Sequence, residues 1–205
     1  MRLHAVIPLK ELPRGKQRLA RSLADEVRRR LILTMLADVV TTLLRSPGIG
    51  RVSVVTREEA LVPSGCAHIP DGADDLNTAL ARAAEVSAAA GAAAMLVVPA
   101  DVPFVECDDI AAILAAHREH TLVAVPDEAD LGTNALLLVP PRLIGTRFGP
   151  RSLAAHEAAA RAADAQFVLV RRPGLAFDVD EPGQLRRLVR EGGTRYAFLE
   201  AGWDG

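Results

Sequence analysis

Three aspartates stand where apolar, strand-like segments end, and acidic side chains in such places are typical metal ligands. Asp101 follows "MLVVPA" (95–100), and Asp178 and Asp180 follow "LAF" (175–177). Residues i and i+2 of an extended segment point the same way, so Asp178 and Asp180 can face one cation. Magnesium typically combines one or two carboxylates with phosphates and water. The three aspartates are therefore predicted to hold Mg²⁺.

Each of these aspartates also has a structural explanation. Asp101 lies two residues before Pro103 and is suited to a turn. Asp180-Glu181-Pro182 is a good helix start, with Asp180 as N-cap and Pro182 in the first turn. The capping and metal-binding roles of Asp180 are compatible with each other.

A basic loop follows the first strand-like segment. "IPLKELPRGKQRLA" (7–20) contains Lys10, Arg14, Lys16 and Arg18. Lysine acts on phosphate as a point charge and arginine as a bidentate fork, so this loop is a candidate phosphate-binding segment. The alternative is a solvated basic loop. The loop contains neither a P-loop nor a G-x-G-x-x-G dinucleotide motif.

Two further segments combine hydrogen-bonding side chains with helix starts. In "PDGADDLNTAL" (70–80), Asp75 or Asn77 can cap a helix, and an amide or carboxylate there could also read a base or a ribose. In "FGPRS" (148–152), Ser152 lies near a helix N-terminus that favours a phosphate or carboxylate, and Gly149 lets the backbone come close. A plain N-cap is the alternative for Ser152.

Two more side chains extend this second anion site. Thr133 in "LGTN" places a hydroxyl beside a glycine. This hydroxyl could bind the same phosphate or carboxylate ligand as Ser152, or it could simply form a turn. His156 follows Ser152 by four residues and shares its helical face, so it can orient the acid. A partly buried structural histidine is an equally good interpretation of His156.

The elements that must position these residues alternate between strand and helix patterns. Strands are expected at 3–9, 51–56, 94–100, 121–126, 134–140 and 166–171, and helices at 24–44, from Asp75 or Asn77 to 90, and at 108–117, 152–163 and 181–190. This order predicts an α/β fold with three layers and a mixed, mostly parallel sheet in which 134–140 runs antiparallel. Ligands of such sheets gather outside the carboxyl ends of the strands, where the candidate residues lie.

Composition narrows the class of protein. The chain has 205 residues, half of them hydrophobic, which suits one domain spanning 1–205. Its 26 acidic and 24 basic residues nearly cancel, so neither nucleic acid nor a membrane surface is expected as a partner. Two cysteines give no disulfide framework, the N-terminus lacks a signal-peptide pattern and no apolar run is long enough to span a bilayer. A cytoplasmic location is expected.

The candidate segments together resemble one family. Five motifs, in this order, are similar to the 2-phospho-L-lactate or phosphoenolpyruvate guanylyltransferases of coenzyme F420 biosynthesis. They are "PLK" (8–10) with Lys16, Arg18 and Leu19, "VVPADVPFV" (97–105), "GTNALLL" (132–138), "FGPRSLAAH" (148–156) and "FDVDEPGQL" (177–185). The resemblance implies a single glycosyltransferase-A-like nucleotidyltransferase domain. It also implies transfer of GMP from GTP to the phosphate of a three-carbon phosphoacid, with release of pyrophosphate.

The resemblance also assigns roles to single residues. It implies that Mg²⁺ is held by Asp101, Asp178 and Asp180, and that Lys16 takes part in catalysis with them. It implies a phosphoacid site of Thr133, Gly149 and Ser152. GTP would be bound by residues of the first loop and of the 71–77 segment: Pro8, Leu9, Lys10, Lys16, Arg18, Asp71 and Asn77.

The chain departs from the family pattern in two places. Asp75 stands where relatives often have glycine, and the acidic "PDEADLG" (126–132) stands where they often have an arginine, a role that Arg147 or Arg151 would have to fill. Phosphoenolpyruvate is the favoured acceptor, because the alanine- and arginine-rich composition suggests a bacterial source and bacterial relatives are mostly associated with it. The alternative acceptor is 2-phospho-L-lactate.

Other classes of protein share parts of this pattern. Molybdopterin-type and sugar-1-phosphate nucleotidyltransferases use magnesium and a similar sheet, but they usually begin with "LAGG-x-x-x-R", where this chain has Pro8-Leu9-Lys10. A non-catalytic nucleotide-binding regulator on the same fold is the other alternative. The sequence also leaves a homodimer open.

Overall fold

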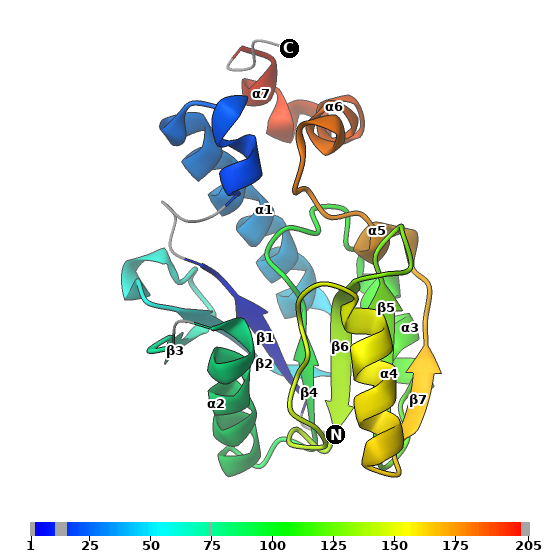
Figure 1. Cartoon of the computed structure of the whole chain (residues 1–205). Coiled ribbons are helices and arrows are strands. Elements are labelled where there is room, and N and C mark those ends of the chain that lie inside the picture. Colours follow the sequence, from blue (N-terminus) through cyan, green and yellow to red (C-terminus); the bar gives the residue numbers. More distant parts are fainter. Residues whose placement is uncertain (1–2, 11–15, 74, 202–205) are drawn as a thin grey trace.

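A seven-stranded sheet runs through the molecule, of which the computed structural model describes residues 3–10, 16–73 and 75–201 (Figure 1). In the spatial order β3-β2-β1-β4-β6-β5-β7, the strands are β1 (Leu3–Pro8), β2 (Ile49–Thr56), β3 (Ala67–Pro70), β4 (Ala94–Val97), β5 (Thr121–Pro126), β6 (Thr133–Val139) and β7 (Gln166–Leu169). β6 runs antiparallel to its neighbours β4 and β5, and the other pairings are parallel. The predicted mixed, mostly parallel sheet is confirmed.

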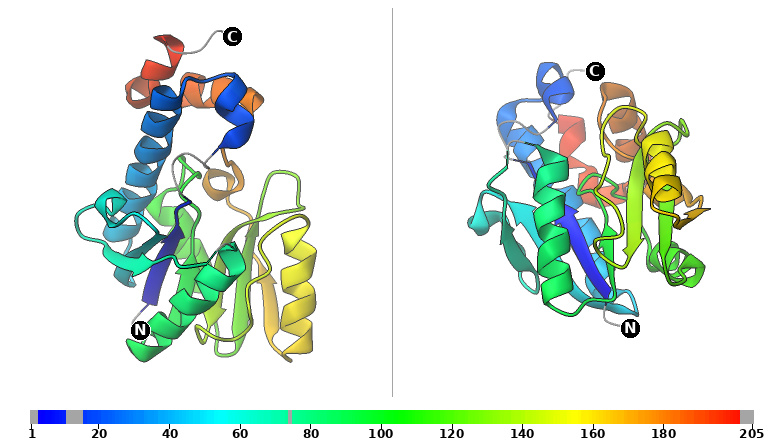
Figure 2. Two further views of the ribbon diagram at one scale, coloured as in Figure 1. Left: turned by 60° about the vertical axis from the view of Figure 1, so that its left-hand side comes forward. Right: turned by 60° about the horizontal axis from the view of Figure 1, so that its bottom comes forward.

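Helices cover both faces of the sheet, which gives the predicted three layers (Figure 2). α1 (Asp25–Arg45) and α3 (Cys107–Ala116) pack on one face, and α2 (Leu76–Ala89) and α4 (Ser152–Ala162) on the other. Neighbouring side chains of β4 alternate between the two sides, because Leu96 packs in the α1 and α3 layer while Met95 and Val97 pack in the α2 and α4 layer. No helix in the described part of the chain is long and apolar enough to cross a membrane.

The sequence pattern does not predict every element. β3 has only four residues and ends at Pro70, which the pattern assigns to a turn. Short helical segments are also absent from the prediction: η2 (Gln17–Arg21), η3 (Glu59–Leu61), α5 (Pro173–Ala176), η4 (Gly193–Tyr196) and α7 (Phe198–Ala201). The longer α6 (Pro182–Glu191) matches the predicted helix 181–190 to within one residue at each end.

A separate hydrophobic cluster joins the N-terminal and C-terminal helices. We call η2, the first half of α1, α6, η4 and α7 the cap. Its buried side chains include Leu19, Leu31, Leu185, Tyr196 and Leu199. Figure 1 shows the cap beyond the carboxyl end of β1, away from the chain's N-terminus. The residues directly before η2 and α6 are thereby held over the sheet edge where ligands of α/β proteins bind.

A buried histidine connects β1 to the layers around it. His4 is 1% exposed; its Nε2 lies 2.7 Å from Ser53 Oγ of β2, and its Nδ1 lies 2.8 Å from Ser87 Oγ of α2. Ser87 donates its hydroxyl proton to the Ala83 carbonyl, so it accepts from Nδ1–H, and Nε2 accepts from the Ser53 hydroxyl. This arrangement requires a neutral ring. Burial, followed by the charge of Arg51, lowers the pKa of His4 to about 4.

The depressed pKa of His4 predicts a loss of stability in mild acid. In the unfolded chain His4 binds a proton below its ordinary pKa of 6.5. In the folded chain it stays neutral until the pH falls to about 4. The free energy of unfolding should therefore fall as the pH drops from 6.5 to 4, by roughly 3 kcal/mol at most from this group. Urea unfolding of the wild-type protein and of His4→Gln at several pH values measures this change in the free energy of unfolding. Equal slopes for both proteins in this window would contradict the assignment.

Candidate active site

The segment after β4 and the segment before α6 lie side by side at the carboxyl edge of the sheet. The Val179 amide donates to the Asp101 carbonyl at 3.1 Å. Val179 itself is fully buried in the cap cluster, so the two aspartates that flank it stand beside Asp101. The structure thus brings Asp101, Asp178 and Asp180 to one place at this edge.

The ammonium of Lys16 lies between two of these carboxylates. Its Nζ donates to Asp180 Oδ1 at 2.5 Å and to Asp101 Oδ2, while its side chain is only 9% exposed. Burial alone would lower the pKa of Lys16, but the attraction of Asp101 and Asp180 outweighs it and raises the pKa. Lys16 is therefore a firmly charged group that links the cap to the sheet.

Asp180 has a different structural role from the one its sequence context suggests. The N-cap of α6 is Glu181, which forms a capping box with Gln184, and Pro182 occupies the first turn. The Asp180 carboxylate instead bonds to Lys16, and its amide donates to Gln184 at 2.7 Å. The interpretation of Asp180 as helix cap is thus wrong, because the neighbouring glutamate takes that position.

The environment of Asp178 disfavours its charged form. Burial, together with the negative charges of Asp101 and Asp180, raises its pKa to about 6. Asn134 of β6 partly offsets this, since its amide lies 3.4 Å from Asp178 Oδ1 while also donating to the Ala176 carbonyl at 3.0 Å. The site therefore holds more negative charge than Lys16 neutralises.

Asn134 is a site residue that the sequence analysis missed, and a β-bulge explains its position. Val125 of β5 pairs with Ala135, but the next residue, Pro126, pairs with Thr133, so Asn134 is an extra residue in β6. A bulge shifts the alternation of side chains along a strand. The signal in the sequence is a lone amide at the head of an otherwise apolar strand.

A cleft of about 500 Å³ opens next to the Lys16 ion pairs. Its lining includes five residues of the predicted GTP site: Pro8, Leu9, Lys10, Lys16 and Arg18. Leu76, Pro99, Ala100, Asp101 and Asp180 also line it. Arg18 lies at its exposed side, 3.2 Å from Glu181. Arg14, which the sequence places in the candidate phosphate-binding loop, lies outside the described residues.

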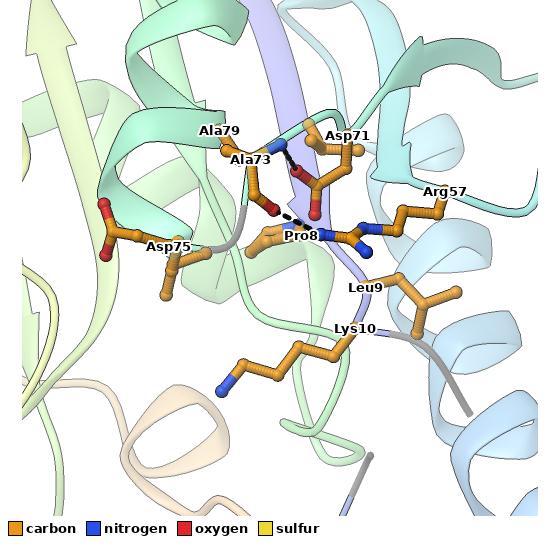
Figure 3. A pocket seen from close by; sticks show the side chains of 10 residues that line it. Pro8, Leu9, Lys10, Arg57, Asp71, Ala73, Asp75 and Ala79 are labelled. Atoms are coloured by element: carbon orange, nitrogen blue, oxygen red, sulfur yellow. Dashed lines mark hydrogen bonds between the residues drawn. The ribbon is translucent and has the colours of Figure 1, made fainter. Parts of the chain in front are cut away.

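A smaller compartment of about 220 Å³ shares Pro8, Leu9, Lys10 and Leu76 with this cleft (Figure 3). Arg57, Asp71, Ala73 and Asp75 complete much of its polar rim. Asp75 also caps α2, as one of the two predicted options, by accepting from the Thr78 amide at 2.8 Å. The structure thus places Asp71 with the first loop, as predicted.

Asn77 contacts protein rather than the cleft lining. Its Oδ1 accepts from the Phe148 amide at 2.8 Å and from the Thr146 hydroxyl at 3.0 Å, and its Nδ2 donates to the Phe148 carbonyl at 2.9 Å. These three bonds fasten the 146–148 loop to the first turn of α2. Its predicted contact with GTP stays a prediction.

The predicted acceptor residues gather around the start of α4. Thr133 Oγ1 lies 3.0 Å from His156 Nδ1, and His156 Nε2 accepts from the Arg147 amide at 2.9 Å. Nδ1 therefore carries the proton and donates to Thr133, which leaves the threonine hydroxyl hydrogen for another acceptor. Burial, with a contribution from Arg147, lowers the pKa of His156 to about 4, so the ring is neutral.

Ser152 and Gly149 frame the same helix start. Arg151 is the N-cap of α4 and has a left-handed backbone, so Ser152 is the first helical residue and not the N-cap. Ser152 is buried, and its amide donates to the Gly149 carbonyl at 3.2 Å. Gly149 has a φ of 139°, which favours glycine. Within the described part of the chain, the lining of the two cleft compartments does not include Thr133, Gly149 or Ser152.

The carboxylates alone do not form a closed metal site. Among the residues that the structure describes, no three histidine, cysteine, aspartate or glutamate side chains lie together so that they could hold a metal ion. Magnesium commonly completes its shell with phosphate oxygens and water around one or two carboxylates. Mg²⁺ binding by the three aspartates stays a prediction.

Comparison with known proteins identifies the family. A model of guanylyl transferases described as CofC-like matches residues 3–200. The chain belongs to this CofC-like guanylyltransferase family. Residues 8–10, 97–105, 132–138, 148–156 and 177–185, on which the resemblance rests, all fall within that span.

Individual relatives agree with the family assignment. The chain is 39% identical to a phosphoenolpyruvate guanylyltransferase of Rubrobacter xylanophilus, over 96% of this chain and 98% of the relative. It is also 39% identical to the phosphoenolpyruvate guanylyltransferase of Nocardia farcinica, over 98% and 93% of the two chains. The family member described here is therefore a nucleotidyltransferase.

Solved structures confirm the fold of the family. A protein of Desulfovibrio desulfuricans, described as a nucleotide-diphospho-sugar transferase, has a TM-score of 0.79 at 16% identity and covers 98% of this chain and 95% of its own. A nucleotidyl transferase of a Methanothermobacter species has a TM-score of 0.67 at 18% identity. The match covers 98% of this chain and 99% of that protein. The predicted nucleotidyltransferase fold is confirmed.

The bonds of Asn77 predict a measurable effect on the 146–148 loop. Asn77→Ala removes all three bonds and should lower the free energy of unfolding by roughly 2 kcal/mol, because it leaves the buried Thr146 hydroxyl and the Phe148 backbone without partners. Asn77→Asp keeps both accepting contacts, although it turns a carboxylate oxygen toward the Phe148 carbonyl in place of the donor. Hydrogen exchange of the Phe148 amide should accelerate in Asn77→Ala and remain slow in Asn77→Asp.

Arg82, an exposed residue of α2, the helix that also contains the mutated Asn77, supplies the control. Arg82→Gln should leave both the unfolding free energy and the Phe148 exchange rate at their wild-type values. If Asn77→Ala behaved like this control, the amide would not hold the loop.

Proposed function

We propose that this protein transfers GMP from GTP to phosphoenolpyruvate, releases pyrophosphate and serves coenzyme F420 biosynthesis. The observation that carries the proposal is the cleft in which Lys10, Lys16 and Arg18 meet Asp101 and Asp180, in a chain of the guanylyltransferase family. The relatives named phosphoenolpyruvate guanylyltransferase support the acceptor. The alternative acceptor is 2-phospho-L-lactate.

The reaction proposed for this site needs no protein nucleophile. An oxygen of the acceptor phosphate attacks the α-phosphorus of GTP, the bond between the α-phosphorus and the bridging oxygen breaks, and pyrophosphate leaves with the electron pair. Positioning and charge neutralisation supply most of the catalysis of such a transfer. Lys10, Lys16 and Arg18 line the cleft and provide positive charge for the phosphates.

The acidic residues fit a divalent cation by their chemistry. Asp101, Asp178 and Asp180 supply hard oxygen ligands. The raised pKa of Asp178 reflects first its burial and then the negative charges of Asp101 and Asp180, which a cation would offset. When bound there, Mg²⁺ would neutralise phosphate charge as well. Lys16 then has both carboxylates and phosphates as partners within one cleft.

The acceptor site is proposed at the start of α4. Ser152 brings a buried hydroxyl at the positive end of the α4 helix dipole, and Gly149 leaves room for a close approach. Thr133 has a hydroxyl hydrogen to donate, because its oxygen accepts from His156. Its neighbour Asn134 contacts Asp178, which links this region to the carboxylate cluster.

Pyrophosphate release tests the proposed function directly. With Mg²⁺ present, wild-type protein should release pyrophosphate only when both GTP and phosphoenolpyruvate are supplied, and mass spectrometry should show the guanylylated acceptor. ATP, CTP and UTP serve as nucleotide controls, and 2-phospho-L-lactate, 3-phosphoglycerate and a sugar 1-phosphate as acceptor controls. Faster release with ATP would reject GTP as the donor. Activity with the sugar phosphate instead would favour the other class of nucleotidyltransferase.

The aspartates are tested by removing their charge without changing their size. Asp101→Asn, Asp178→Asn and Asp180→Asn should each reduce turnover about 100-fold or more, because charge that develops in the transition state is no longer balanced. Calorimetric titration with Mn²⁺ in the presence of GTP should show weakened metal binding in parallel.

The matched control is Asp164→Asn. Asp164 is exposed just beyond the far end of α4 and has a left-handed backbone that asparagine tolerates. Near-normal turnover and Mn²⁺ binding in both Asp178→Asn and Asp180→Asn would show that these two residues are structural.

A further inference from the structure

The smaller compartment has apolar walls and a carboxylate at its rim. Pro8, Leu9, Val55, Leu76 and Ala79 supply apolar surface, and Figure 3 shows Asp71 and Arg57 on the side of β2 and β3. Apolar walls with a few placed polar groups are typical of small-molecule sites. Because the compartment shares Pro8, Leu9 and Lys10 with the larger cleft, a ligand can reach from one into the other.

Asp71 is fixed in place by its own backbone and by the turn that follows it. Its amide donates to the Thr56 carbonyl at 3.0 Å, and its Oδ1 accepts from the Ala73 amide at 3.0 Å. Arg57 holds the same turn, since its Nη2 donates to the Ala73 carbonyl at 2.9 Å. Figure 3 shows the second carboxylate oxygen directed toward Pro8 and Arg57, away from the bond to Ala73. The carboxylate is thereby presented to the compartment in one orientation.

We infer that the small compartment holds the guanine base and that the Asp71 carboxylate recognises it. A carboxylate accepts hydrogen bonds and cannot donate them, and guanine presents two neighbouring donors, N1–H and the N2 amine, on its Watson–Crick edge. Adenine presents an acceptor at N1, so its edge meets the carboxylate with a repulsive lone pair. This inference rests on the proposed function, because it assumes that the cleft binds a nucleoside triphosphate, and it adds the residue that selects the base.

The larger compartment then takes the triphosphate. Lys10 lines both compartments and Lys16 lines the larger one beside Asp101, so positive charge continues from the base pocket to the carboxylate cluster. A base in the small compartment and phosphates near Lys16 use the whole cleft. The opposite orientation would place phosphates against the carboxylate of Asp71 and the apolar walls.

An exchange of base specificity tests this inference. Asp71→Asn keeps an oxygen for the Ala73 amide and replaces the other oxygen with an NH2 donor. Xanthine keeps N1–H but has a carbonyl where guanine has its amine, so this variant should prefer XTP. We expect the ratio of GTP to XTP affinity, measured by titration of fluorescent nucleotide analogues without acceptor, to fall at least 100-fold. A gain in XTP binding cannot arise from damage to the fold.

Asp75→Asn tests the other carboxylate of the compartment, and Glu85→Gln on the exposed side of α2 is the matched control that should leave the ratio unchanged. Asp75 is a second carboxylate at the same compartment, and asparagine is an equally good N-cap for α2. The ratio of GTP to XTP affinity should stay near the wild-type value, and inversion of the ratio by Asp75→Asn alone would assign the recognition to the wrong residue.

The remaining outcomes separate this inference from the proposed function. If Asp71→Asn weakens GTP, ATP and XTP equally, the carboxylate binds the ribose or merely holds the turn, and the inference is wrong while the guanylyltransferase proposal stands. An unchanged GTP to XTP ratio in a variant that still binds GTP overturns it too. If wild-type protein binds no nucleoside triphosphate, the proposed function itself fails.

Discussion

The buried charge of Lys16 is the constraint around which the site is arranged. An ammonium removed from water is costly unless counter-charges lie close to it, and Asp101 and Asp180 provide them. Because Asp101 follows β4 of the sheet and Asp180 comes just before α6 of the cap, this pairing fixes one part against the other. Removing a partner would leave an uncompensated charge in a nearly closed position, so the geometry of the cleft depends on all three residues.

The cap makes this pairing possible, although Lys16 and the two aspartates that it binds lie outside the elements that form the cap. Leu19, Leu185 and Leu188 are buried together with Val179, which lies between Asp178 and Asp180. Burial of apolar side chains contributes on the order of 2 kcal/mol each, and it holds residues from opposite ends of the chain in one cluster. Hydrophobic packing therefore sets where the charges lie, while the charges determine what the cleft can bind.

The sequence predicted the sheet well because strand and helix periods are local properties. It placed Asp101 correctly after a strand, but it was wrong about the strand-like segment before Asp178 and Asp180, which is the short helix α5. These two aspartates reach Asp101 because the Val179 amide between them bonds to the Asp101 carbonyl. It failed where a position depends on distant partners: Asp180 binds Lys16 because Glu181 caps α6, and Asn134 faces Asp178 because a bulge shifts β6. Asn77 looked like a ligand-binding amide, but its partners lie some seventy residues further along the chain, with the Phe148 contact at a separation of 71.

The first turn of α2 connects the two halves of the site. Leu76 lines both compartments of the cleft, and the next residue, Asn77, holds Phe148 by its amide and carbonyl. His156 holds the same loop at Arg147 and also donates to Thr133. A displacement of this turn would therefore change the wall of the cleft and the approach to α4 together. Because buried polar groups strongly resist losing their partners, the structure keeps these two regions in a fixed relation and reduces the reorganisation needed to bring two phosphates into line.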